Sequence, residues 1–292
     1  MGPFDMSQVL AAATPRVRVA AIGAMFLNES LKEPHDGLMQ KGLCDVIGFE
    51  PVQEQCDLLN ALHGPLHRYL PVVVGDGSRR IFHHGNASMT SSIYPPNDKL
   101  IRCFHQLPHL MQVVERREVQ TFRLDDLPEV GDIDLFKIDV QGAELDVFRG
   151  APRTLGNAVV VHTEVAFVPL YEGQPLFGEV DIALRQAGFL FHRFEGEIQG
   201  RSFRPLVPPQ GPDGRMSQEM WVDAIYVKDF TRLGELSTRK RLVLAMLLHD
   251  VYRSYDLCAY VLHVQDQIDG SDFWAPYLTR LTGSPPPERL ED

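Results

Sequence analysis

Between Arg16 and Val227, short apolar runs rich in β-branched residues alternate with segments of helical pattern. Such runs are typical of buried strands. Strands that alternate with helices predict an α/β domain with a mainly parallel sheet and helices on both faces. Seven strands are predicted, at residues 17–22, 46–49, 70–74, 133–140, 158–163, 189–194 and 221–227.

Proline and glycine positions set the predicted helix boundaries in the same region. A proline at a first helical turn predicts a helix at 52–62. A second helix is expected to begin near Gly142, and a third to cover residues 177–187. Ser, Pro and His residues interrupt the stretch 79–127, in which only residues 119–124 are predicted to be extended.

The pattern becomes helical after Asp229, where apolar residues recur at steps of three and four. This apolar stripe consists of Leu244, Leu247, Leu248, Val251, Tyr255, Cys258 and Leu262. It is open whether the stripe packs on the rest of the chain, pairs with a second copy or covers the site as a lid. We favour packing that also supports self-association as a homodimer.

These patterns divide the chain into three parts. Residues 1–15 form an N-terminal segment, residues 16–229 the α/β domain, and residues 230–292 a helical extension. The tail of the extension contains three consecutive prolines at 285–287 and is expected to be disordered.

Composition narrows the range of partners. The 292 residues carry a formal net charge of -11, and 44% of them are hydrophobic. An acidic chain repels phosphate backbones and anionic lipids, so neither nucleic acid nor a membrane is an expected partner. No apolar stretch reaches the roughly 20 residues of a spanning helix, and no secretory signal is visible, so we expect a cytoplasmic location. The four cysteines lie far apart, which predicts reduced, mostly buried thiols.

Ligands in an open parallel sheet bind beyond the carboxyl ends of the strands, so the residues there are candidates for a site. Along the predicted strands in order, these residues are Gly23 and Ala24, Glu50, Asp76, Asp139, and His162 with Glu164. The small pair after the first strand lets a ligand approach the backbone. Glu50 can accept hydrogen bonds from both ribose hydroxyls of a nucleoside cofactor, and Asp76 is a candidate for the adenine edge.

The loop after the first strand reads GAMFLN at residues 23–28 and lacks the G-x-G-x-x-G pattern. A dinucleotide needs that glycine turn for its pyrophosphate. S-adenosylmethionine has no phosphate and therefore tolerates the loss.

From Asp134 the chain reads DLFKIDVQGAE, and FRGA follows at residues 148–151. This run closely resembles the signature of the FkbM family of S-adenosylmethionine-dependent methyltransferases. Further matching segments follow the family order: IGFEP at 47–51, VGDG at 74–77, TSSIYP at 90–95, EVAFVPLY at 164–171 and WVDAIY at 221–226.

The resemblance covers about residues 17–227. It implies a Rossmann-like class I methyltransferase fold, a seven-stranded sheet with one antiparallel edge strand, and O-methylation of sugars, glycans or natural products. One position departs from the family pattern, because Ala21 stands where an acid often precedes the first-loop glycine by two residues.

Methyl transfer to oxygen requires alignment and the removal of a proton from the acceptor. Asp139, His162 and Glu164 are the candidate bases, because all three are expected at the same edge of the sheet. Glu144 is interpreted as an acid that complements the dipole of the following helix. Two other functions are weighed: a nicotinamide-dependent oxidoreductase, which the missing glycine pattern disfavours, and a non-catalytic Rossmann-like binding protein, which Ala21 favours.

A divalent cation is left open and unassigned. It could be held by Asp139 and lower the pKa of the acceptor. The adjacent His83 and His84 are interpreted as surface residues, because neighbours on a strand point to opposite faces and do not easily bind one ion.

Overall fold

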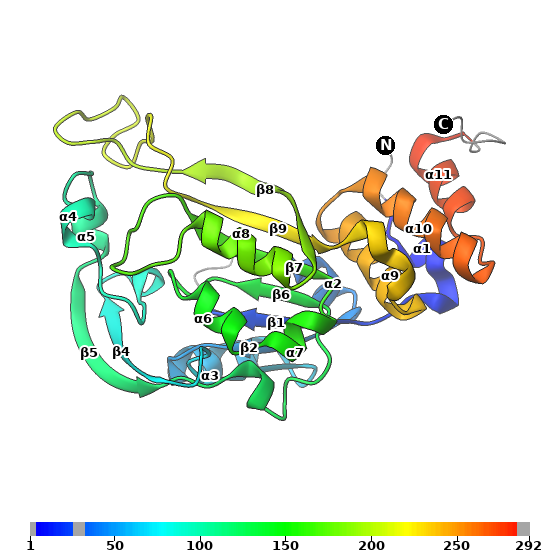
Figure 1. Ribbon diagram of the computed structural model, residues 1–292, viewed down its shortest axis with the longest axis horizontal. Coiled ribbons are helices and arrows are strands. Elements are labelled where there is room, and N and C mark those ends of the chain that lie inside the picture. The colour runs from blue at the N-terminus through cyan, green and yellow to red at the C-terminus, as the bar shows by residue number, and fades with distance from the viewer. Residues whose placement is uncertain (1–3, 26–32, 285–292) are drawn as a thin grey trace. The chain divides into compact units, whose positions relative to one another are not determined.

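The computed structural model describes residues 4–25 and 33–284. These residues fall into two compact units, which are drawn in Figure 1. The sheet unit contains residues 19–25 and 46–227, and the helical unit contains the remaining described residues. The proline tail at 285–287 and most of the loop after the first strand lie outside the described residues.

Seven strands form one sheet in the order β3-β2-β1-β6-β7-β9-β8. Their bounds are β1 Val17–Ile22, β2 Cys44–Phe49, β3 His67–Leu70, β6 Leu135–Ile138, β7 Val160–Ala166, β8 Phe189–Gln199 and β9 Trp221–Lys228. The pairs β1–β6, β6–β7 and β2–β3 are parallel, and β9 is antiparallel to β7. The predicted seven-stranded, mainly parallel α/β sheet is confirmed, and its order is that of a doubly wound, Rossmann-like fold. The expected position of the antiparallel strand is wrong, because β9 lies between β7 and β8 and not at the edge.

The three predicted helices are present as α3 (Gln53–His63), α6 (Glu144–Arg149) and α8 (Phe177–Gln186). Figure 1 shows α6, α7 (Pro152–Asn157) and α8 on one face of the sheet. The main core lies there, built from these residues, among others: Phe136, Ile138, Val161, Val165, Leu145, Val147, Phe148, Val180 and Leu184. Because strand side chains alternate, Lys137 and His162 project from the opposite face.

The third strand lies further back in the chain than predicted. The sequence favours 70–74, but β3 ends at Leu70 because Pro71 follows, and proline has no N–H group for a sheet ladder. Asn60 of α3 also fixes β3, since its side-chain amide donates to the Tyr69 carbonyl at 2.9 Å and accepts from the Tyr69 N–H at 2.8 Å. Val74 makes only an isolated bridge, to Phe122.

A hairpin that the sequence did not predict occupies much of the stretch 79–127. Its antiparallel strands are β4 (Arg79–Gly85) and β5 (Val113–Gln120), so the extended segment expected at 119–124 is shifted. The hairpin loop carries the helical turns η2 (Ser88–Thr90), α4 (Asp98–Ile101) and α5 (Leu107–Leu110), and η3 (Leu124–Asp126) follows β5. Most β5 side chains are exposed, so they lack the apolar run of a buried strand.

The helical unit consists of short N-terminal elements and the C-terminal helices. Its elements are α1 Ser7–Leu10, η1 Ala11–Ala13, α2 Asp36–Gln40, η4 Phe230–Glu235, α9 Thr238–Met246, η5 Leu247–Val251, α10 Tyr255–Asp269 and α11 Trp274–Thr282. The predicted stripe is not one helix, because Arg253 adopts φ 54° between η5 and α10. Leu244, Leu247 and Leu262 are fully buried in the chain, so they offer no exposed face for the predicted homodimer.

Two expectations from composition can be compared with the structure. Cys44, Cys56 and Cys258 are buried and Cys103 is exposed, and all four are free, which confirms mostly buried thiols. Burial raises the pKa of Cys44 to about 12 and that of Cys56 to about 11, so both stay protonated at neutral pH. In the part of the chain that the structure describes, no helix has the length and apolarity needed to cross a membrane.

Candidate functional site

The ends of β1 and β6 meet at the centre of the sheet's carboxyl edge. The Asp139 N–H donates to the Ile22 carbonyl at 3.0 Å. Gly23 has φ +80°, and a Cβ there would lie 1.9 Å from the Asp139 carbonyl oxygen. The backbone conformation and the close approach of the two strands therefore both require a glycine at position 23. This structural requirement is additional to the prediction that the small residue lets a ligand approach the backbone. Gly23 and the adjacent Ala24 both donate their N–H groups to the Phe49 carbonyl of β2.

Glu50 follows β2 directly and is only 3% exposed. Its Oε1 accepts from the Val52 N–H at 3.0 Å, which fixes the carboxylate beside the first turn of α3. Burial raises the pKa of Glu50, while the Val52 hydrogen bond and the positive charge of Arg117 act in the opposite direction. The structure thus places a buried carboxylate where the sequence predicts the ribose contact.

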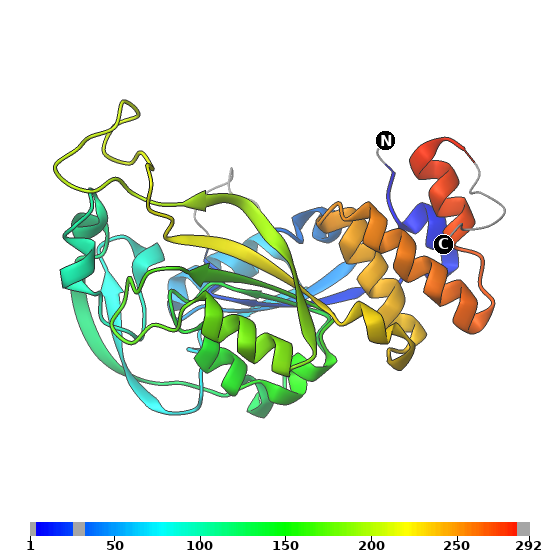
Figure 2. The same ribbon diagram turned by 45° about the horizontal axis from the view of Figure 1, so that its top comes forward.

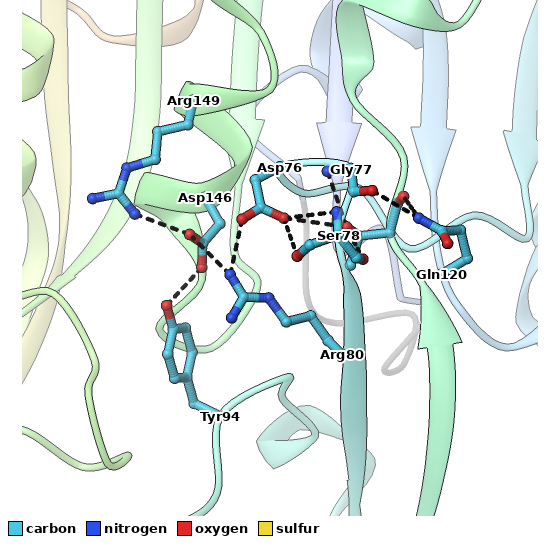
Figure 3. A network of polar contacts seen from close by, with 9 residues as sticks. Asp76, Gly77, Ser78, Arg80, Tyr94, Gln120, Asp146 and Arg149 are labelled. Atoms are coloured by element: carbon cyan, nitrogen blue, oxygen red, sulfur yellow. Dashed lines mark hydrogen bonds and ion pairs between the residues drawn. The ribbon is translucent and has the colours of Figure 1, made fainter.

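Asp76 does not close a strand, in contrast to its predicted place, and belongs to a polar network shown in Figure 3. Its carboxylate accepts from the Ser78 N–H at 3.0 Å and from Arg80 at 2.8 Å. Although burial alone would raise the pKa of Asp76, the hydrogen bonds from Ser78 and Arg80 lower it to about 2. Both oxygens already accept hydrogen bonds within the chain, which favours a structural role over the predicted adenine contact.

The same network reaches α6. Arg80 also lies 3.8 Å from the carboxylate of the buried Asp146, which accepts from the Tyr94 hydroxyl at 2.6 Å and from Arg149 at 3.1 Å (Figure 3). The turn after Val74, the loop after β4 and α6 are therefore linked through charged hydrogen bonds, which are stronger than neutral ones.

Two predicted site residues, Asp139 and Glu164, are joined by an amide that the sequence analysis did not select. Gln141 Nε2 donates to Asp139 Oδ1 at 2.7 Å and lies 3.5 Å from Glu164 Oε1. The Tyr171 hydroxyl lies 3.1 Å from Gln141 Oε1 and 3.0 Å from the Thr90 carbonyl, and can donate to either. These contacts fix which side of the amide faces the two carboxylates.

The backbone at Gln141 is held in an unusual conformation. Its φ is 53°, in the left-handed region that costs a non-glycine residue energy. The Ser92 hydroxyl donates to the Gln141 carbonyl at 2.7 Å, and Glu144 Oε1 accepts from the N–H groups of Val140 and Gly142 on either side. Glu144 thus closes the turn before α6, a more specific role than the predicted dipole-complementing acid.

Carboxyl groups gather at this edge, and their pKa values respond to one another. Burial raises the pKa of Glu164 well above its usual value, and the negative charges of Asp139, Glu144 and Asp223 raise it further, while Lys137 acts against them. Burial also raises the pKa of Glu144 to about 7, against its backbone hydrogen bonds. Perturbed carboxyl groups of this kind cluster at functional sites.

The shifted pKa of Glu144 predicts a pH-dependent stability. Its folded-state pKa of about 7 lies above the ordinary 4.5, so its stabilising effect is complete below pH 4.5 and is lost as pH rises through 7. A shift of this size corresponds to about 3 kcal/mol. The free energy of unfolding of the unmodified chain should fall as the pH rises from 5 to 8. In Glu144→Gln we expect this fall to be smaller by about 2 to 3 kcal/mol, as measured by denaturant titrations.

Glu172→Gln is the control for that measurement, because it makes the same chemical change at an exposed position. An equal pH dependence in Glu144→Gln and the unmodified chain would contradict the assignment.

His162, the third candidate base, does not close its strand as expected: it lies inside β7, opposite Ile225 and four residues before the end of the strand at Ala166. It is buried, and its Nε2 lies 3.2 Å from Asp223 Oδ2 of β9. Although burial alone would raise the pKa of Asp223, the His162 hydrogen bond and the charge of Lys137 lower it. This arrangement favours a positioning role for His162 through Asp223.

His83 is buried rather than a surface residue as expected, and burial together with the charge of Arg116 lowers its pKa. Within residues 4–25 and 33–284, no group of three or more His, Cys, Asp or Glu side chains is arranged to hold a metal ion.

Sequence reasoning missed Gln141, Tyr171 and Asp223 as parts of this site. All three lie in the segments that resemble the FkbM family, at residues 134–144, 164–171 and 221–226. The signal was therefore present in the motifs, but the residue types alone did not indicate a role.

The chain is similar to known methyltransferases in sequence. A family model described as the methyltransferase FkbM domain matches residues 25–191. The 2-O-methyltransferase NoeI of Sinorhizobium fredii is 34% identical over 148 residues, which are 46% of this chain and 59% of that protein. The aligned part thus spans less than two thirds of NoeI.

Three solved structures resemble the chain at low identity. A TehB-like methyltransferase from Corynebacterium glutamicum is 13% identical with a TM-score of 0.33, covering 78% of this chain and 89% of that one. Magnesium protoporphyrin IX methyltransferase from Synechocystis, solved with bound SAM, is 12% identical with a TM-score of 0.38 and covers 76% of each chain. A methyltransferase structure from Thermoplasma acidophilum is 9% identical with a TM-score of 0.33, covering 78% and 76%.

Proposed function

The chain belongs to the FkbM methyltransferase family, and from this premise we propose that it transfers the methyl group of S-adenosylmethionine to a hydroxyl oxygen of a sugar, glycan or natural product. The observation that carries the proposal is the row of side chains along the carboxyl edge. Glu50 directly follows β2, Asp139 directly follows β6 beside β1, and Glu164 stands on β7 two residues before its end. Ligands of doubly wound sheets bind beyond this edge, at the point where the strand order reverses.

The residues present fit this cofactor. S-adenosylmethionine has no phosphate, so it does not require a glycine-rich phosphate-binding pattern at the turn around Gly23. Glu50 presents a buried carboxylate at the nucleoside end. A carboxylate in that place can accept the two ribose hydroxyl hydrogens. When bound, S-adenosylmethionine supplies an electrophilic methyl group on a sulfonium.

The chain's own residues align the acceptor and remove its proton. Glu164 is the base in this proposal, because it stands on β7 beside Asp139, and burial and the neighbouring carboxylates raise its pKa, so that its ionised form accepts a proton more readily than an ordinary glutamate does. Asp139 supplies part of the charge that raises it, and the Gln141 amide holds both carboxyl groups. Alignment contributes roughly 7 to 11 kcal/mol to such reactions.

We further propose that residues 16–229 form the catalytic domain and residues 230–292 a helical extension. A cytoplasmic location is consistent with four free cysteines, because disulfides are rare in a reducing compartment. An oxidoreductase is set aside for lack of the glycine pattern. A non-catalytic binding protein, which Ala21 favours, would bind cofactor without forming S-adenosylhomocysteine in an assay with candidate glycan acceptors.

The cofactor end of the proposal is tested at Glu50. We expect Glu50→Ala to weaken S-adenosylhomocysteine binding at least tenfold, because a charge-assisted hydrogen bond contributes about 1.5 to 3 kcal/mol. Isothermal calorimetry on the folded variant measures the change. Glu54→Ala, an exposed position on the same helix α3, is the control and should bind as the unmodified chain does. Unchanged affinity in Glu50→Ala would remove Glu50 from the site.

A further inference from the structure

A long loop between β8 and β9 carries an unusual surface. It lies beside α4 and α5 in both views of the molecule (Figures 1 and 2). Phe203 of this loop stacks on Phe104 with ring centroids 4.4 Å apart. The Arg204 N–H donates to the Cys103 carbonyl at 2.8 Å, and the His105 N–H donates to Ser202 at 3.2 Å. The loop is therefore attached to the α4–α5 segment at its base.

At this attachment and beyond it, the loop exposes large apolar side chains. The exposed fraction is 47% for Phe203, 58% for Leu206, 53% for Val207 and 51% for Met216. We call these four residues the apolar tip. Pro205 stands between them and stiffens the backbone, so that these side chains stay exposed at low entropic cost.

The loop that carries the apolar tip has a positive charge although the chain as a whole is acidic. Residues 200–220 contain three arginines, one aspartate and one glutamate, against a net charge of -11 for the whole chain. Lys99 and Arg102 on or next to α4 are exposed beside the base of the loop. Among the ion pairs of the described residues, none includes Arg204 or Lys99. The local positive charge therefore attracts anionic partners, whereas the net charge of the chain predicts that they are repelled.

The surface is connected to the reacting end of the sheet. Asn97, the N-cap of α4, donates to the Leu170 carbonyl through its backbone N–H at 2.8 Å and to Pro169 through its side chain at 2.9 Å. Phe104 and Tyr171 belong to one apolar cluster. Tyr171 in turn contacts Gln141, which holds Asp139 and Glu164. The segment that holds the apolar tip is therefore linked through successive contacts to the residues around the proposed base.

We propose that the apolar tip and its cations dock on an anionic phospholipid membrane, so that the methyl acceptor is a hydroxyl displayed at such a surface. The inference about the acceptor rests on the proposed function. Apolar side chains that enter the lipid interface and cations that face its headgroups are the two elements of peripheral membrane binding. Four apolar side chains are too few for a stable protein interface, which takes about 20 to 30 residues on each side.

Vesicle co-sedimentation of the full chain tests this inference. We expect binding to vesicles of equal parts phosphatidylcholine and phosphatidylglycerol, weak or absent binding to phosphatidylcholine alone, and loss of binding at high salt. The double variant Leu206→Ser, Val207→Ser should bind at least tenfold more weakly, as should Arg204→Glu. These side chains are exposed, so their replacement leaves the fold intact.

Ile182→Ser is the matched control, because Ile182 is also 58% exposed but lies on α8. It should bind vesicles as the unmodified chain does. Equal binding to both vesicle types, or equal binding by the double variant and this control, would overturn the inference. Calorimetry with S-adenosylhomocysteine separates the two proposals. If the unmodified chain does not bind S-adenosylhomocysteine, the proposed function is refuted, whereas the vesicle-binding result is unaffected.

Discussion

Glu164→Gln lowers turnover about 10²- to 10⁴-fold while cofactor affinity stays within a few-fold, if Glu164 takes the proton of the acceptor hydroxyl. The substitution keeps the size of the side chain and its oxygen toward the Gln141 amide, but it removes the basic oxygen. A base acts mainly in the transition state, so its loss appears in kcat rather than in cofactor binding. Single-turnover formation of S-adenosylhomocysteine with an identified acceptor measures the effect.

Two measurements keep that result interpretable. Glu172→Gln, an exposed glutamate close to the same segment, should turn over normally. S-adenosylhomocysteine calorimetry shows whether the Glu164→Gln site is intact. Normal turnover by an intact Glu164→Gln enzyme would exclude Glu164 as the base.

The fold was predictable where one face of an element is buried. β1 has the predicted bounds because its residues from Val17 to Ile22 are apolar and buried except for Arg18, and a glycine follows them. The third strand was misplaced because Val72–Val74 resembles a strand, whereas the side chain of Asn60 fixes the strand at His67–Leu70 instead. The β4–β5 hairpin was missed because its exposed strands carry charges and no apolar period.

The site was predictable as a set of strand ends but not as a network. The rule that ligands bind beyond the carboxyl ends of parallel strands selects Glu50, Asp139 and Glu164 as candidates, and their roles stay predictions. Glu50 and Asp139 directly follow β2 and β6 as expected, whereas Glu164 lies inside β7 because that strand continues to Ala166. Asp76 shows the limit of that rule, since Ser78 and Arg80 occupy its carboxylate. The raised pKa of Glu164 arises from burial and from carboxylates on other strands, and such tertiary proximity cannot be read from local patterns.

The variant Asp139→Asn distinguishes two roles of Asp139: a charge that raises the pKa of Glu164, or the base itself. If Asp139 only raises the pKa of Glu164, Asp139→Asn removes a negative charge, the pKa of Glu164 falls, and Glu164 loses its proton at lower pH. The acidic limb of kcat against pH should then move to lower pH by on the order of 1 unit, with a modest loss at the plateau. The asparagine retains an oxygen that can accept from Gln141, so the turn is preserved. A loss of about 10²- to 10⁴-fold at every pH, without a shift of the limb, would instead identify Asp139 as the base.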